Sequence, residues 1–457
     1  MPPHRRRLFC PVALLADGWA REVVLELDGQ GRIASIDLSG DAGGSERLSG
    51  PVVPALTNLH SHAFQRAMAG LAEVAGTGED SFWTWRTEMY RILALMGPDD
   101  IEAIAAKLYM ELLKGGFGRV AEFHYLHHGP DGTPYADAAE TSRRILVAAG
   151  RTGIGLTHLP VFYAHANFGG AAPGEGQRPF LHDVDGFLAL LDALAPACRE
   201  AGATLGLAIH SLRAATPGEM HAILGHERTG GPIHIHVAEQ ERELADCLAW
   251  SGRRPVEWLL DEMPVDARWC AIHATQMDEA ETVRLARSGA VAGLCPATEA
   301  NLGDGLFPAT GFLAAGGRFG IGTDSHVATS VAQELRLLEY GQRLRDRRRN
   351  RLAAAPGASV GRSLLDGALA GGAQAAGQFT HGLGIGAPAD LLVLDGTEPF
   401  LAMAEGDAIL DRWIFALGDG AVRDVIIGGR FVIRDHTHSA EAEIDAAFAR
   451  TLAKLRA

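Results

Sequence analysis

The segment "PVVPALTNLHSH", residues 51–62, carries the clearest signal for the fold of this chain. It is a nearly continuous apolar run, which predicts a strand covered on both faces, as in a parallel sheet. The run ends in His60 and His62. Side chains alternate along a strand, so both imidazoles would project from the same face. This spacing suits two ligands of one metal ion, although a His-x-His pair alone is a weak signal.

The rest of the chain repeats this apolar pattern between segments rich in Ala and Leu. Further strands are predicted at 119–125, 153–162, 204–212, 232–239, 268–274, 290–296 and 318–326. Helices are predicted between them, for example at 98–114, 184–201, 278–288 and 330–347. Eight such strands alternating with helices predict an α/β fold with a parallel sheet, and their number favours a closed (β/α)8 TIM-like barrel.

The two ends of the chain have a different, hairpin-like character. The stretch "REVVLELDGQGRIASIDL" predicts two strands joined by a turn at residues 28–31, and "ADLLVLD" and "VRDVIIGGRFVI" predict a similar arrangement near the carboxyl end. Neither end has enough strands for a stable sheet of its own. We therefore expect 1–52 and 388–457 to form one small β-sandwich domain with a C-terminal helix, and the barrel, 53–387, to be inserted between them.

Composition and charge exclude several classes of function. A formal net charge of −15 over 457 residues disfavours a nucleic-acid backbone as partner. No apolar run approaches the roughly 18 residues that span a bilayer, and the amino terminus lacks a convincing signal peptide. We therefore expect a cytoplasmic protein without a membrane partner. The basic run "RLRDRRRNR", 343–351, is interpreted as a solvated helix face rather than a polyanion site.

Cysteine and lysine usage narrow the chemistry further. The five cysteines are scattered and never form a C-x-x-C pair, which argues against a disulfide framework and a thiolate zinc site. The lysines are Lys107, Lys114 and Lys454 alone. There is accordingly no phosphate-loop lysine, and a Schiff-base lysine would have to be one of these three.

Polar residues gather where the predicted strands end, which is where the chemistry of a (β/α)8 barrel takes place. A single buried histidine is usually a hydrogen-bonded core residue. Imidazoles at the ends of most strands indicate a shared task, because burying many polar groups is costly. After His60 and His62, the residues in question are His124, His158, His210, His234, His236, His273, Asp324 and His326.

One subset of these residues has the composition of a metal site. His60, His62, His236 and Asp324 supply three imidazoles and one carboxylate, which suits Zn²⁺ with a water molecule completing its shell. His234 alternates with His236, but the H-x-H then H-x-x-E pattern selects His236. Glu239 follows where a strand gives way to a helix, so its carboxylate can face the water without binding the metal.

Several motifs together resemble one known superfamily. "NLHSHAFQRAM", "HVAEQ", "AIHATQM", "CPATEANLGDG" and "IGTDSH" are similar to motifs of the amidohydrolase superfamily. The similarity extends over nearly the whole chain, including "SFWTWRTEMY", "AIHSLRA" and "ELRLLEYGQRL". The combination with "HSLRA" and "FWTWR" resembles the formimidoylglutamate deiminases of histidine degradation.

This resemblance implies one zinc ion per chain, a homodimer and a set of site residues. It implies His60, His62, His236 and Asp324 as ligands, and Glu239 and His273 as acid–base residues. It also implies a substrate pocket lined by Gln65, Arg86, Tyr125, His210 and Arg213. The lysine census supports a mononuclear site, because binuclear relatives use a carbamylated lysine at the end of the fourth strand, where this chain has His210.

Without the resemblance, the residues support these assignments to different degrees. Arg213 lies three residues past His210, near the expected barrel mouth, where its planar guanidinium can hold a carboxylate through two hydrogen bonds. Arg86 suits a surface ion pair equally well. The segment "LGDG", 302–305, is interpreted as a turn. Glu299 and Asn301 either cap a loop or brace the pocket, and the sequence does not decide between these roles.

The expected reaction is hydrolysis of N-formimino-L-glutamate to N-formyl-L-glutamate and ammonia. Zinc-bound water would attack the formimino carbon, Asp324 and His273 would take up its proton, and Glu239 would pass a proton to the departing nitrogen. A purine- or pterin-type aromatic-base deaminase is the alternative with the same chemistry. A barrel that has lost its metal and serves as a non-catalytic scaffold is the alternative from another class.

Overall fold

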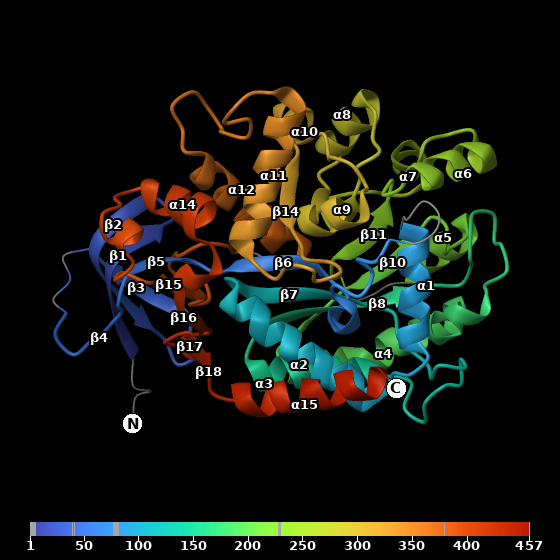
Figure 1. The fold of residues 1–457 in the computed structure, drawn as a ribbon, viewed down its shortest axis with the longest axis horizontal. Helices are drawn as coiled ribbons and strands as arrows, with labels where there is room; N and C mark the ends of the chain where they lie inside the picture. Colours follow the sequence, from blue (N-terminus) through green and yellow to red (C-terminus); the bar gives the residue numbers. More distant parts are fainter. Residues whose placement is uncertain are drawn as a thin grey trace.

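The computed structural model describes residues 6–38, 40, 42–75, 82–226, 230–378 and 380–456. Figure 1 shows strands surrounded by helices beside a separate sheet, in which blue strands from the start of the chain lie next to orange-red strands from its last part. Both parts of the predicted architecture are therefore present.

The larger part is the predicted barrel of parallel strands, with the order β6-β7-β8-β10-β11-β12-β13-β14. Backbone hydrogen bonds between its first and last strands bring the barrel close to closure: Asp324 N donates to His60 O at 3.1 Å, and His62 N donates to Asp324 O at 3.3 Å. The strands are β6 (Leu56–Ser61), β7 (Phe117–His124), β8 (Gly155–Phe162), β10 (Leu207–Ser211), β11 (Ile233–Val237), β12 (Trp269–His273), β13 (Val291–Leu294) and β14 (Arg318–Ile321).

The predicted strand at 204–212 is interrupted in the structure. The short β9 (Thr204–Leu205) pairs with β8, and β10 begins after Gly206. A Cβ atom at Gly206 would lie 2.5 Å from the carbonyl oxygen of Pro232, so the close approach of that backbone requires glycine here.

Helices surround the barrel and connect its strands (Figure 1). Those that follow β6, β7 and β8 in the chain are α1 (Phe82–Leu93), α2 (Pro98–Lys114), α3 (Glu140–Thr152) and α4 (Val184–Glu200). Those after β10 to β14 are α5 (Pro217–His226), α6 (Glu241–Ser251), α7 (Pro255–Glu262), α8 (Glu279–Arg287), α9 (Pro296–Leu302), α10 (Ala309–Ala314), α11 (Val331–Asp346) and α12 (Val360–Ala375). Their apolar faces pack on the strands, whose residues are almost all buried.

The opening segment 51–62 is shared between the two parts of the molecule. Its first four residues form β5 (Pro51–Pro54), which pairs with β15 (Leu391–Leu394) in the separate sheet, and only β6 enters the barrel. Between them, Ala55 N donates to Asp390 O at 3.0 Å, whereas Leu56 N donates to Gly116 O at 3.3 Å. Strand pairing therefore puts the first boundary at Ala55, beyond the predicted 52/53.

The separate sheet combines both chain ends, as predicted. Its hydrogen-bonded order is β18-β17-β16-β15-β5-β1-β2-β3, with β4 beside β1, so its strands form one continuous sheet. The predicted turn at 28–31 is present: the Asp28 carboxylate accepts hydrogen bonds from Gln30 N at 2.8 Å and Arg32 N at 3.0 Å. The remaining strands are β1 (Arg6–Leu15), β2 (Gly18–Leu27), β3 (Ile33–Asp37), β4 (Glu46–Arg47), β16 (Val422–Ile427), β17 (Arg430–Arg434) and β18 (Thr437–His438).

The C-terminal helix packs against a helix of the barrel. We expected it to belong to the small domain, but α15 (Glu441–Leu455) lies along α2 on the flank of the barrel (Figure 1). Lys114 Nζ contacts Glu441 Oε1 at 2.5 Å, and Lys107 Nζ contacts Asp445 Oδ1 at 2.7 Å. Because α15 follows β18 of the separate sheet and contacts α2 of the barrel, it links the two parts of the molecule.

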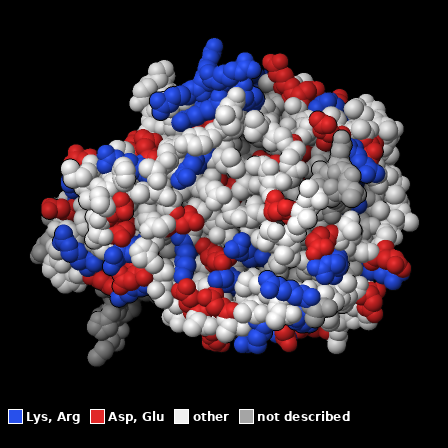
Figure 2. Space-filling model, viewed as in Figure 1, with Lys and Arg blue, Asp and Glu red and all other residues white. Residues whose placement is uncertain are grey.

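The basic run 343–351 lies on the surface, in agreement with its interpretation as a solvated segment (Figure 2). Figure 2 shows basic side chains gathered at the top of the view, over the loop after α11. Residues 343–346 end α11, whereas 347–351 lie beyond it, so only the first part is helical. Arg343 pairs with Glu339 and Arg351 pairs with Asp346, both at 2.6 Å.

All five cysteines are free in the structure, and all five are buried. Among the helices that the structure describes, none combines the length and apolar character required to cross a bilayer.

Candidate metal centre and substrate pocket

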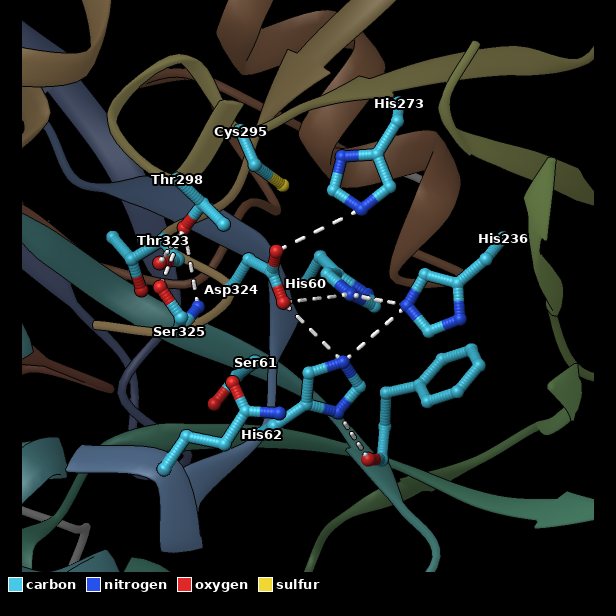
Figure 3. A network of polar contacts seen from close by, with 12 residues as sticks. His60, Ser61, His62, His236, His273, Cys295, Thr298, Thr323, Asp324 and Ser325 are labelled. Carbon is cyan, nitrogen blue, oxygen red and sulfur yellow. Dashed lines mark hydrogen bonds and ion pairs between the residues drawn. The ribbon is translucent and has the colours of Figure 1, made fainter. Parts of the chain in front are cut away.

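Four side chains from three barrel strands converge at the carboxyl end of the barrel (Figure 3). The Nε2 atom of His236 lies 3.0 Å from that of His60 and 3.3 Å from that of His62. Asp324 Oδ1 lies 3.4 Å from His60 Nε2 and 3.3 Å from His62 Nε2. The structure therefore brings together the four predicted ligands, each at most 5% exposed.

The hydrogen bonds behind the cluster decide which atoms face its centre. His62 Nδ1 lies 3.0 Å from Phe123 O, and His236 Nδ1 lies 2.8 Å from His210 O. A carbonyl oxygen only accepts, so both Nδ1 atoms carry the proton and both Nε2 lone pairs point inward. Burial lowers the pKa of all three imidazoles, which favours their neutral, ligating form.

The donor set fits a divalent cation such as zinc. Lone pairs that face one another at 3.0–3.4 Å repel unless a cation lies between them. Two zinc bonds of about 2.0 to 2.1 Å that meet at roughly 90° to 109° put neighbouring ligand atoms about 2.9 to 3.4 Å apart. Spacing and protonation thus both suit a metal ion at this position.

Backbone strain is concentrated around the cluster. Ala238, His273 and Asp324 have positive φ angles of 51°, 68° and 45°, although none is glycine. Such conformations typically cost about 1 to 3 kcal/mol each and persist where the surrounding structure enforces them. Here they lie where β11, β12 and β14 end, and they turn the chain at the positions from which the site residues project.

Glu239 and His273 lie beside the cluster without entering it. His273 Nε2 is 3.8 Å from Glu239 Oε1 and 3.7 Å from Asp324 Oδ2. Burial raises the pKa of Glu239 to about 7. Burial alone would lower the pKa of His273, but the surrounding carboxylates outweigh it and raise that pKa. A carboxyl group that titrates near neutrality beside a metal site is suited to proton transfer.

The structure distinguishes the roles of Glu299 and Asn301, which the sequence left open. Glu299 Oε1 accepts a hydrogen bond from Cys295 N at 2.9 Å and lies 3.3 Å from His273 Nδ1. It therefore orients the His273 ring. Asn301 instead donates to Glu73 Oε1 at 2.6 Å.

A single pocket connects the metal cluster with all five residues predicted to contact the substrate. Gln65 Nε2 donates to the Tyr125 hydroxyl at 3.1 Å on one wall. Arg86 lies with its guanidinium carbon 5.7 Å from the Tyr90 ring centre on another. The lining comprises His62, Gln65, Trp85, Arg86, Met89, Tyr90, Tyr125, Tyr163, Phe180, His210, Arg213, His236, Glu239, His273, Leu302, Asp324 and Ser325.

Arg213 is the most informative residue of this pocket. It is 6% exposed, and its Nε atom is buried without a hydrogen-bond partner. Its Nη2 atom lies 4.0 Å from Glu243 Oε2, a carboxylate that already accepts from Ala238 N and Glu239 N. A buried guanidinium that lines a pocket and has an Nε without a partner indicates an anionic ligand.

Sequence reasoning missed part of the pocket wall. Tyr163 directly follows β8, so the strand-end rule applied to tyrosines would have found it. Phe180 ends a 3-10 helix, η2 (Glu175–Phe180), in a long loop without periodicity. The interpretation of 302–305 as a mere turn is wrong: Leu302 lines the pocket, and Asp304 is buried in contact with Gln240.

Two other histidines at strand ends have structural roles. His234 Nε2 lies 2.8 Å from Ala375 O, on the outer side of the barrel, in agreement with the choice of His236 as the ligand. His326 Nε2 accepts a hydrogen bond from His62 N at 3.2 Å, and its Nδ1 lies 2.7 Å from Thr323 Oγ1. His326 thus supports a metal-site residue from behind.

Family models match both parts of the chain. Residues 52–432 match the amidohydrolase family, and residues 6–50 match the N-terminal domain of formimidoylglutamate deiminase HutF. The chain is 57% identical over 448 residues to a formimidoylglutamate deiminase from Pseudomonas aeruginosa, covering 98% of this chain and 99% of that protein. It is 27% identical to a 5-methylthioadenosine/S-adenosylhomocysteine deaminase from Natronomonas pharaonis, covering 84% of this chain and 81% of that protein.

Solved structures show the same architecture. An amidohydrolase from Brucella melitensis superposes with a TM-score of 0.94 at 50% identity, covering 99% of this chain and 100% of that one. A zinc-bound adenosine deaminase from Xanthomonas campestris superposes with a TM-score of 0.81 at 20% identity, covering 98% of each chain. The second likeness is one of fold.

Proposed function

The chain belongs to the amidohydrolase family and, within it, to the formimidoylglutamate deiminases, and we propose that it hydrolyses N-formimino-L-glutamate to N-formyl-L-glutamate and ammonia. The observation that carries this proposal is the pairing, within one pocket, of a four-donor metal cluster with the buried guanidinium of Arg213, whose Nε has no hydrogen-bond partner. The substrate has the matching two ends, an amidine-like carbon and carboxylates.

We propose zinc as the metal, held by His60, His62, His236 and Asp324. Support comes from the neutral imidazoles, the spacing of their Nε2 atoms, and the zinc-bound structure of similar fold. When bound, zinc polarises the substrate and lowers the pKa of a water molecule to roughly 7, which makes it a nucleophile at neutral pH.

The residues around the cluster transfer protons and bind the substrate. Asp324 takes up the proton of the attacking water, and His273, whose Nε2 lies 3.7 Å from Asp324 Oδ2, acts as the acid–base partner of that carboxylate, accepting a proton only after it has given up its own. Glu239 passes a proton to the departing nitrogen, a role favoured by its raised pKa. Arg213 binds a substrate carboxylate, with Gln65, Arg86, Tyr125 and His210 forming the other walls.

An ammonia-release assay tests the proposed substrate directly. The metal-loaded protein would be offered N-formimino-L-glutamate, N-formimino-L-aspartate, and a panel of purines and pterins. We expect ammonia from formimino-glutamate with an equal amount of N-formyl-L-glutamate. Preferential turnover of a purine or pterin would support the aromatic-base deaminase instead, and no turnover of any substrate would support a non-catalytic scaffold.

The metal site leads to a prediction about stoichiometry. Purified protein should retain about one zinc, or a replacing divalent ion, per chain, as measured by atomic emission. His236→Asn should lose this ion, because it removes one of four ligands. His234→Asn is the matched control and should retain it, because His234 bonds to Ala375 O on the outside of the barrel. Two tightly held ions per active chain would contradict the mononuclear assignment.

The pathway, cellular location and oligomeric state of the enzyme remain predictions from the resemblance and the composition. We propose a role in histidine degradation, a cytoplasmic location and a homodimer, with a small-molecule substrate as the ligand. The net charge of −15 supports the absence of a nucleic-acid partner. Cell fractionation and light scattering of the purified protein would check location and oligomeric state.

A further inference from the structure

A second group of metal-binding atoms lies next to the proposed zinc site. His273, Cys295 and Asp324 each offer one ligand atom, and these atoms all lie within 4.8 Å of one another. They come from the ends of three successive strands, β12, β13 and β14. Figure 3 shows the Cys295 sulfur on the same side as the His273 ring and the Asp324 carboxylate. All three side chains are at most 5% exposed.

The two groups share Asp324 but use opposite oxygens of its carboxylate. Oδ1 lies 3.4 Å from His60 Nε2 and 3.3 Å from His62 Nε2, whereas Oδ2 lies 3.7 Å from His273 Nε2. A carboxylate can bridge two cations in this way. Glu239 Oε1, 3.8 Å from His273 Nε2, is available as a further oxygen donor on the second side.

Two of these donors are held in place by one neighbour. Glu299 Oε1 accepts from Cys295 N at 2.9 Å and lies 3.3 Å from His273 Nδ1. The bond at Nδ1 directs Nε2 of His273 toward Asp324, as in metal sites where the outer nitrogen of a histidine is fixed by a carboxylate. The carboxylates of Glu239, Glu299 and Asp324 surround this ring, so the local charge favours a cation.

We propose that His273, Cys295 and Asp324, with Glu239 as a fourth donor, form a second, inhibitory site for a thiophilic divalent cation such as excess Zn²⁺ or Cd²⁺. A thiolate, an imidazole and carboxylates are a donor set that suits these ions. Binding forms a metal–sulfur bond and a metal–nitrogen bond, and it releases the Cys295 thiol proton and the Nε2 proton of charged His273 to solvent. The inhibitory effect rests on the proposed function, because the ion would occupy the His273 and Glu239 atoms that transfer protons.

The route to this site runs through the substrate pocket. His273, Asp324 and Glu239 line that pocket, whereas Cys295 is absent from its described lining. An ion would therefore enter where the substrate enters, and Cys295 would hold it from behind. A change at Cys295 leaves the pocket wall as it is, so the basal activity should persist.

Titration of the zinc-loaded enzyme with additional Zn²⁺ tests the proposal. Wild type should lose activity, and chelation of the excess ion should restore it. Cys295→Ala should remain active and require about 10-fold or more Zn²⁺ for half-inhibition, since loss of even an outer partner typically lowers metal affinity about 10- to 100-fold. Cys270→Ala is the matched control, because Cys270 belongs to the same buried apolar cluster but not to the donor group.

A binding measurement separates this site from the catalytic proposal. Co²⁺ added to the zinc-loaded wild type should produce a thiolate-to-cobalt absorption band that Cys270→Ala retains and Cys295→Ala lacks. The band is expected even if the protein proves inactive on formimino-glutamate, so failure of the proposed function would be recognised separately. Equal inhibition of wild type and Cys295→Ala, or no band in the wild type, would overturn the second site.

Discussion

Glu239→Gln is expected to lower kcat by about 10²- to 10⁴-fold, the usual contribution of a positioned acid–base group. Glutamine keeps the shape of the side chain but neither takes up nor releases a proton. Glu239 is buried beside His273, and its pKa is raised to about 7, so it can act in both protonation states near neutrality. Steady-state rates of ammonia release on formimino-glutamate would measure the loss.

Metal content separates this role from that of a ligand. The variant should keep the zinc stoichiometry of wild type, because the four converging donors do not include Glu239. Glu241→Gln is the matched control: it makes the same change two residues later, at an exposed position in the first turn of α6, and should leave kcat unaltered. Loss of zinc from Glu239→Gln would show that our division of roles is wrong.

Arg213→Met is expected to reduce kcat/KM by roughly 30-fold or more. Methionine occupies part of the same volume but offers no donors to a carboxylate. The Arg213 guanidinium is buried and its Nε has no partner, so a substrate carboxylate would bind there away from water. Truncating one partner of such a desolvated pair typically costs about 2 to 5 kcal/mol, which sets the expected loss.

The division between kcat and KM shows what Arg213 contributes. Loss of uniform binding would raise KM alone, whereas misplacement of the formimino carbon would also lower kcat, and we expect both. Arg242→Met, at an exposed position of α6, is the control for removing a positive charge. The decisive comparison uses formimino-glutamate with amides in place of its carboxylates. If wild type and Arg213→Met discriminate equally against it, Arg213 does not recognise a carboxylate.

Local sequence signals determined most of the secondary structure of the barrel. The helix predicted at 98–114 has these bounds in the structure, because Pro98 begins it and a pair of glycines follows Lys114. Apolar runs located all eight strands, since strands covered on both faces have little room for polar residues. The change of strand partner at Ala55 has no local signal, because β5 and β6 are equally apolar and only their partners distinguish them.

The position of the site also followed from the sequence, because strands of a parallel barrel all end at the same rim. Polar residues at those ends, His60, His62, His236 and Asp324, were therefore expected to meet before any distance was known, and the structure places them together. The place of Glu239 beside the metal cluster followed from its spacing after His236. In each case the signal lies within a short stretch of sequence. The residues come together in space because all strands of the barrel end at the same rim.

What only the tertiary structure decided depends on contacts between distant segments without periodic signals. The docking of α15 on α2 depends on pairs such as Lys114 with Glu441, which no local pattern identifies. The burial of Asp304 and the Phe180 wall arise from loops whose paths are determined by what they pack against. The approach of Cys295 to His273 and Asp324 requires the ends of three separate strands. Sequence periodicity specifies which face of an element is buried, but the partner that covers it is selected by packing of the whole chain.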